Sequence, residues 1–279
     1  MGQRKRSEAG IVDSAATKRR GPLRSPLRLA LVVLAAVLLA GISSATLLLA
    51  GGDDSGGPSD PKTAAIVDQL SLTHPNPEFV ASARGLLAEA GYLTDYFPGE
   101  QVTVDFYRGL PQRGYDLILL RVHAGITTEV DIVSGERTET EYVSLFTGEP
   151  YSPNKYPEER LNRLGKATYY DGAPPLFGIG PDFVTNMEGT FDDTLIVMMG
   201  CDGLKSQRTA QAFLDKGAGA FVSWSQPVSA SHTDGATQNL LERLLIDGLP
   251  TSEAVSRTAA EIGPDPVYEA ELRVLEADS

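Results

Sequence analysis

The chain is poor in the residues that build disulfides and metal sites. Its 279 residues include one cysteine, Cys201, and only three histidines, His74, His123 and His232. A single cysteine excludes an internal disulfide, and these residues do not follow the spacing of metal ligands. The segment Gly178-Ile179-Gly180 lacks the third glycine of a dinucleotide-binding loop. The sequence therefore indicates no metal and no cofactor.

Positive charge is also scarce outside the first residues. Residues 1–28 hold eight of the 24 basic side chains and two of the 37 acidic ones, so the rest of the chain has a formal charge of −19. Such a surface repels phosphate backbones, and nucleic acid is excluded as the expected partner. The charge is suited to keeping an exported domain soluble.

Only one long stretch has no charged residue. Leu29–Ala50 is 22 residues long, and at about 1.5 Å per residue a helix of that length crosses a hydrocarbon core of about 30 Å. We expect a basic cytoplasmic arm (1–28), a transmembrane helix (29–50), a flexible linker (51–61) and an extracytoplasmic domain (62–279) on a single-pass membrane protein. A signal peptide cleaved near Ser43-Ser44-Ala45 is the alternative. No cysteine follows the apolar run closely enough to carry a lipid.

The remainder alternates between apolar strands and amphipathic helices. Strands are expected at 63–67, 102–106, 115–122, 194–200 and 218–224, and helices at 76–91, 157–167, 206–216, between Asp234 and Gly248, and at 251–262. This order predicts an α/β fold with a mostly parallel sheet covered by helices on both faces. Residues 126–133 and 138–146 predict an inserted β-hairpin around Ser134-Gly135, either a flap that contacts substrate or a solvated decoration.

Two of the expected strands end in reactive side chains. The strand 115–122 is followed by His123, and the strand 194–200 by Cys201. The carboxyl ends of parallel strands meet at one edge of a sheet, so an imidazole and a thiol are expected in a common crevice. A thiol attacks a carbonyl as the thiolate, and a nearby imidazole can take its proton. Burial of Cys201 as a small apolar residue is the plain alternative.

The segments after Cys201 carry a resemblance. The chain Ala212–Val222, followed by Trp224, Pro227-Val228, Asp234 and Ala236-Thr237, is similar to the tail of CHAT-domain proteins. Together with the strands that end in His123 and Cys201, it resembles the caspase-like (clan CD) cysteine peptidases, which include caspases, gingipains and legumains. The similarity covers roughly residues 62–263 and is strongest over 194–256.

The resemblance implies a caspase-like fold and a catalytic dyad of His123 and Cys201. It also implies an oxyanion site made by the backbone amides of Ala124 or Gly125 and of Cys201. The expected substrate cleft comprises Asp202, Trp224 and Ser225, although a tryptophan at a strand end also suits the core.

The chain departs from the family in two places. Ala124 stands where glycine is usual, and Met199 stands where relatives selective for basic residues carry aspartate. The sequence thus predicts a membrane-anchored cysteine endopeptidase that acts on peptides or proteins. A non-catalytic caspase-like binding or scaffold module and a flavodoxin-like ligand-binding domain remain the alternatives.

Overall fold

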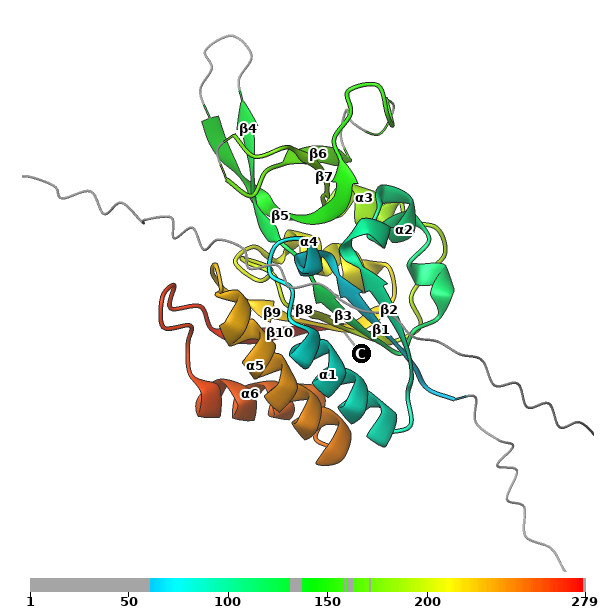
Figure 1. Ribbon diagram of the computed structural model, residues 1–279, viewed down its shortest axis with the longest axis vertical. Helices are drawn as coiled ribbons and strands as arrows, with labels where there is room; N and C mark the ends of the chain where they lie inside the picture. The colour runs from blue at the N-terminus through cyan, green and yellow to red at the C-terminus, as the bar shows by residue number, and fades with distance from the viewer. Residues whose placement is uncertain (1–60, 131–136, 158, 160–162, 171, 278–279) are drawn as a thin grey trace, which may run out of the picture. The chain divides into compact units, whose positions relative to one another are not determined.

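Two β-sheets organise the part of the chain that the structure describes. The computed structural model describes residues 61–130, 137–157, 159, 163–170 and 172–277 (Figure 1). A six-stranded sheet, sheet A, has the order β10-β9-β8-β3-β1-β2, and a four-stranded sheet, sheet B, has the order β4-β5-β7-β6.

Sheet A is mostly parallel. Its strands are β1 (Thr63–Asp68), β2 (Leu93–Pro98), β3 (Leu117–Arg121), β8 (Thr194–Met198), β9 (Ala218–Trp224) and β10 (Leu272–Glu276). All neighbouring pairs are parallel except β10 with β9. The predicted mixed α/β fold with a mostly parallel sheet is confirmed.

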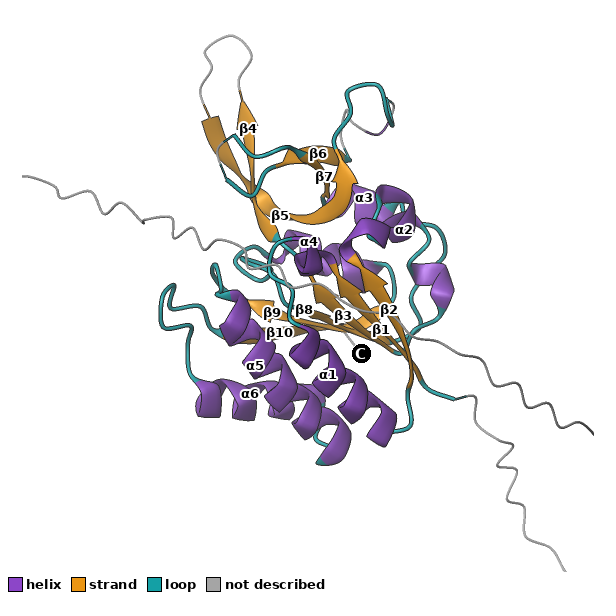
Figure 2. Ribbon diagram, viewed as in Figure 1, coloured by secondary structure: helices purple, strands orange, loops and turns teal. Residues whose placement is uncertain are grey.

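Helices cover both faces of sheet A (Figures 1 and 2). One face carries α1 (Pro77–Glu89), α5 (Ala230–Leu241) with its π-helical extension η5 (Glu242–Ile246), and α6 (Thr251–Ile262). The other carries α2 (Val104–Arg108), α3 (Pro181–Thr185) and α4 (Gln207–Asp215). Short 3₁₀ turns are η1 (Gln69–Leu72), η2 (Gly99–Gln101) and η3 (Pro111–Arg113).

Two separate cores explain why the central strands of sheet A are mostly apolar. Successive side chains of a strand point to opposite faces. In β3, Ile118 and Leu120 join the core under α4, whereas Leu117 and Leu119 join the core with α1, α5 and α6. A strand buried on both faces is therefore apolar at most positions.

Local capping sets where the site-flanking helices begin. The Asn76 side chain accepts a hydrogen bond from the Phe79 amide, and Pro77 opens α1. The Ser206 hydroxyl accepts one from the Arg208 amide at the start of α4. These contacts satisfy amides that a helix N-terminus leaves without partners.

The inserted hairpin is part of sheet B. Strand β4 (Ala124–Val130) pairs antiparallel with β5 (Arg137–Pro150), as predicted. Strand β5 also pairs antiparallel with β7 (Leu176–Ile179), and β7 pairs antiparallel with β6 (Leu164–Ala167). The predicted turn around Ser134-Gly135 lies outside the described residues.

Two predicted elements are wrong. The predicted strand 102–106 lies mostly in α2, because the Thr103 hydroxyl accepts from the Phe106 amide and starts a helical turn. The predicted helix 157–167 ends as strand β6, where Leu164 and Ala167 are buried against sheet B. The second strand of sheet A is instead β2.

The predicted arm, transmembrane helix and linker lie outside the described residues, except Pro61. Within the described ranges, none of the helices has the length and apolar character needed to cross a bilayer.

Candidate active site

Strands β3 and β8 are neighbours and bring the predicted dyad to one edge of sheet A. Their register pairs Leu117 with Leu195 and Leu120 with Met198. His123 comes three residues after Leu120, and Cys201 three residues after Met198. Neighbouring strands lie about 4.8 Å apart, so the two residues follow strand ends that lie side by side.

Gly200 keeps these strand ends close. A Cβ atom at this position would lie 2.4 Å from the Val122 carbonyl oxygen and 3.2 Å from the Ala124 Cβ. No side chain fits at the first of these distances, so a glycine directly before Cys201 permits the backbone before His123 to approach. This contact was not anticipated from the sequence.

Hydrogen bonds and aromatic rings fix His123. Its backbone amide donates to the Gln69 side-chain oxygen (2.9 Å), and its Nε2 lies 2.8 Å from the Thr73 hydroxyl. The ring packs against Tyr169, with centroids 4.6 Å apart, and against Phe146 at 6.0 Å. Sheet B and the segment before β7 therefore form one wall around the imidazole.

The environment of His123 disfavours its charged form. Burial, followed by the positive charges of His74 and Arg121, lowers the pKa of His123 to about 4. The imidazole is accordingly neutral near pH 7.

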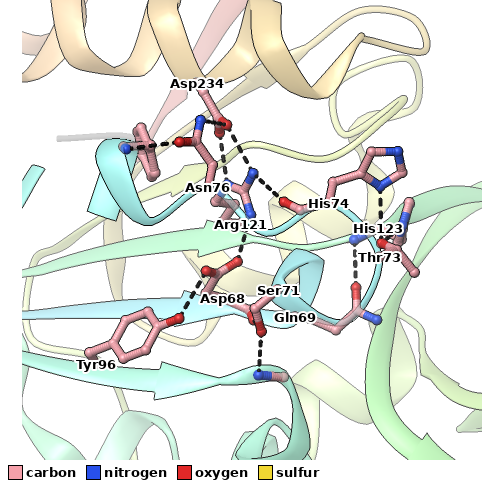
Figure 3. Close-up of polar contacts among 12 residues, drawn as sticks. Asp68, Gln69, Ser71, Thr73, His74, Asn76, Tyr96, Arg121, His123 and Asp234 are labelled. Carbon is pink, nitrogen blue, oxygen red and sulfur yellow. Dashed lines mark hydrogen bonds and ion pairs between the residues drawn. The ribbon is translucent and has the colours of Figure 1, made fainter. Parts of the chain in front are cut away.

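A buried ion cluster lies beside His123 (Figure 3). Arg121 is 1% exposed and donates to Asp68 at 2.8 Å and to both carboxylate oxygens of Asp234 at 2.8 and 2.9 Å. It also donates to the His74 carbonyl at 2.9 Å. Tyr96 donates to Asp68.

The ion cluster joins β1, β3, α5 and the segment after η1, and thereby fixes the loop that holds His123. Sequence reasoning missed it. The available signal was an arginine at the end of an otherwise apolar strand, two residues before His123.

Cys201 has contacts of its own, separate from those of His123. Its Sγ accepts from the Val228 amide at 3.4 Å and donates to the Val228 carbonyl at 3.7 Å. The side chain packs against the small cluster of Trp224, Val228, Ala236 and Ala270. Burial raises the pKa of the Cys201 thiol, with Asp202 and Asp265 adding to the effect and the Val228 backbone opposing it. The resting group is therefore a thiol, and no hydrogen bond joins it to His123 among the described residues.

The three predicted cleft residues lie next to Cys201 but are buried. Trp224 is 1% exposed and donates to the Thr233 hydroxyl, and Ser225 is 7% exposed and exchanges hydrogen bonds with the Glu271 backbone. Asp202 has φ +61° and donates its amide to the Gln226 carbonyl. Trp224 thus packs against Cys201, and the side chains of Trp224 and Ser225 are both buried.

The backbone amides predicted for the oxyanion site differ in direction. Ala124 pairs with Leu145 and Gly125 with Ser144, and the Phe146 amide donates to the His123 carbonyl. Because hydrogen-bonded pairs alternate along an antiparallel ladder, the Gly125 amide faces β5 and the Ala124 amide faces away from it. Ala124 is therefore the better placed of the two donors.

No group of three or more histidine, cysteine, aspartate or glutamate side chains within the described part of the chain could hold a metal ion. Neither the family models nor the curated proteins include a match to this chain.

Proposed function

We propose that this protein is a caspase-like cysteine endopeptidase, anchored in the membrane by residues 29–50 and facing the outside of the cell. The observation that carries the proposal is the pairing of β3 with β8, since His123 and Cys201 follow the ends of these two neighbouring strands. The close approach of Gly200 to the Val122 carbonyl adds to it.

The order of elements supports the caspase-like assignment. His123 follows β3, Cys201 follows the adjacent strand β8, and then come α4 and β9 with Trp224 at its end. This is the arrangement that the resemblance implies. The insertion that follows His123 forms sheet B and contacts the imidazole through Phe146.

Formation of the acyl-enzyme requires one proton transfer from Cys201 to His123 and one from His123 to the leaving amine. The Cys201 thiol gives its proton to His123 as sulfur attacks the scissile carbonyl, and the oxyanion is stabilised by the amides of Ala124 and Cys201. Collapse of this intermediate breaks the C–N bond, and His123 protonates the departing amine. Water then hydrolyses the thioester and returns the proton to sulfur.

The directions of the pKa shifts at His123 and Cys201 indicate when the thiol loses its proton. A lowered pKa at His123 and a raised pKa at Cys201 give a neutral resting pair. The thiolate is formed during attack, when the developing negative charge on the carbonyl oxygen meets backbone donors. Residue 199 is methionine, so this position offers no carboxylate to bind a basic substrate side chain next to the scissile bond.

The test is covalent labelling followed by turnover. A peptidyl acyloxymethyl ketone library should modify Cys201, and a peptide library should be cleaved by the wild type. Cys201→Ala should abolish both reactions, and His123→Ala should slow turnover by about 10²- to 10⁴-fold, the usual contribution of a general acid–base. His232→Ala serves as the matched histidine control and should keep activity. Turnover that persists in Cys201→Ala contradicts the proposal.

One observation favours a second function, a caspase-like module that binds without cleaving. The thiol already exchanges hydrogen bonds with the Val228 backbone and is buried enough for its pKa to rise. If the thiol reacts with electrophiles only after denaturation while the native chain still captures peptides, the binding module is the function.

A further inference from the structure

The Thr73 hydroxyl lies between two imidazoles. Its Oγ1 is 2.8 Å from the His123 Nε2 and 3.0 Å from the His74 Nδ1. The two rings face each other edge to face, with centroids 5.7 Å apart. The three side chains therefore form one hydrogen-bonded chain from the half-buried His123 to the exposed His74.

A hydroxyl has one proton, so it can donate to only one of the two rings. When His123 carries its proton on Nε2, it donates to Thr73, and Thr73 is free to donate to an unprotonated Nδ1 of His74. This arrangement leaves Nδ1 of His123 as the one ring nitrogen able to accept a proton. In the reverse arrangement, with His74 Nδ1–H donating to Thr73 and Thr73 donating to Nε2, the His123 proton sits on Nδ1.

We propose that Thr73 and His74 are positioning residues: the His74 Nδ1 accepts the Thr73 proton, and the Thr73 oxygen accepts from Nε2 of His123, which selects the His123 tautomer with Nδ1 unprotonated. The consequence for catalysis rests on the proposed function. The tautomer and its coupling to His74 rest on the geometry alone.

The segment that carries both residues is built to hold them. The His74 amide donates to the Leu70 carbonyl, and its own carbonyl accepts from Arg121 of the ion cluster. The Asp68 and Asp234 carboxylates hold that arginine in turn. Because the His74 carbonyl is bound by Arg121 of the buried ion cluster, the backbone next to Thr73 is held in place, and this positions the Thr73 hydroxyl.

The charged and titratable groups around His123 come from several elements. His74 lies on the segment before α1, Arg121 on β3, and Tyr169 before β7. The carboxylates nearest to this set, Asp68 and Asp234, are engaged by Arg121. His74 is accordingly the exposed member of this set.

Nitrogen-15 NMR of the histidines in the full chain tests the proposal directly, since three histidines give a spectrum that single replacements assign. The wild type should show neutral His123 as the Nε2–H tautomer near pH 7. Thr73→Val should lose the hydrogen-bonded Nε2–H signal, and the conservative control Thr73→Ser should retain it. His74→Phe, which removes the acceptor of the Thr73 proton, should shift the His123 nitrogen resonances.

Alkylation of Cys201, the one cysteine of the chain, gives the second readout. Its rate with iodoacetamide near pH 7 should fall about five-fold in Thr73→Val, the effect of one lost hydrogen bond, and stay within about two-fold in Thr73→Ser. A wild-type His123 found as the Nδ1–H tautomer, or a Thr73→Val spectrum and rate equal to the wild type, overturns the inference. Absence of peptide cleavage beside the expected tautomer overturns the proposed function and leaves this inference standing.

Discussion

Replacing Arg121 with methionine should be among the most destabilising single changes in the described domain. The substitution keeps much of the side-chain volume but leaves the carboxylates of Asp68 and Asp234, 1% and 5% exposed, without their shared cation. Breaking a buried ion pair by removing one partner costs about 3–5 kcal/mol. That is a large fraction of the ~5–15 kcal/mol by which a typical domain is stable.

Urea unfolding of the wild type and Arg121→Met at pH 7 measures this cost. Arg257→Met is the matched control, because Arg257 pairs with Glu253 on the exposed surface of α6, where an ion pair contributes about 0–1 kcal/mol. Adding Asp68→Asn and Asp234→Asn to Arg121→Met should restore part of the loss, since two buried charges are then removed. If Arg121→Met costs no more than Arg257→Met, the ion cluster does not stabilise the fold as argued.

Three further outcomes are expected. The pKa of His123 falls from 6.5 to about 4 on folding, so the unfolded chain binds more protons than the folded chain below pH 6.5. The free energy of unfolding should therefore drop by about 2 kcal/mol between pH 7 and pH 5, and by about 3 kcal/mol between pH 7 and pH 4. Urea unfolding of His123→Phe should lack this component, and equal pH dependence in both proteins would refute it. Gly200→Ala should lower the stability of the fold by about 1–3 kcal/mol and slow Cys201 alkylation, because the added Cβ would lie 2.4 Å from the Val122 carbonyl oxygen. The control is Gly85→Ala, inside α1, where no atom lies within 4 Å of the added Cβ, and this change should be neutral or stabilising. Protease treatment of intact cells should remove the chain after Gly51, and protection until the membrane is opened would contradict the outward orientation.

The sequence was sufficient where one physical signal dominated. The apolar runs of β1, β3, β8 and β9 and the caps at Asn76 and Ser206 each have a local cause, and the corresponding elements were predicted. The placement of His123 and Cys201 after neighbouring strands followed from the same runs together with the rule for parallel sheets.

The remaining features depend on contacts between distant segments. The run Val102–Phe106 alternates as a strand does, but Thr103 caps a helical turn and Glu149 of β5 accepts the Val104 amide. Strand β6 forms because β7 offers it a pairing edge. No local pattern reports either contact.

The support of His123 was missed for the same reason. Gln69, Thr73 and Arg121 are separated from their partners by about 50 residues or more. Arg121 stood out only as a charge at the end of an apolar strand, and its partners could be identified only once β1 and α5 were placed beside β3.

His123 and Cys201 are held by two separate sets of contacts. His123 is tied to the η1 segment and to sheet B, whereas the thiol of Cys201 is tied to Val228 after β9. Proton transfer between them requires the thiol to leave the Val228 backbone, since a sulfur engaged there cannot at the same time donate to an imidazole. A substrate strand that took up the Val228 amide and carbonyl would release the thiol at the moment the scissile carbonyl arrived. On the proposed function, Val228 would link occupation of the site to formation of the thiolate, and a neutral resting pair is the state expected of an enzyme that stays inert until substrate binds.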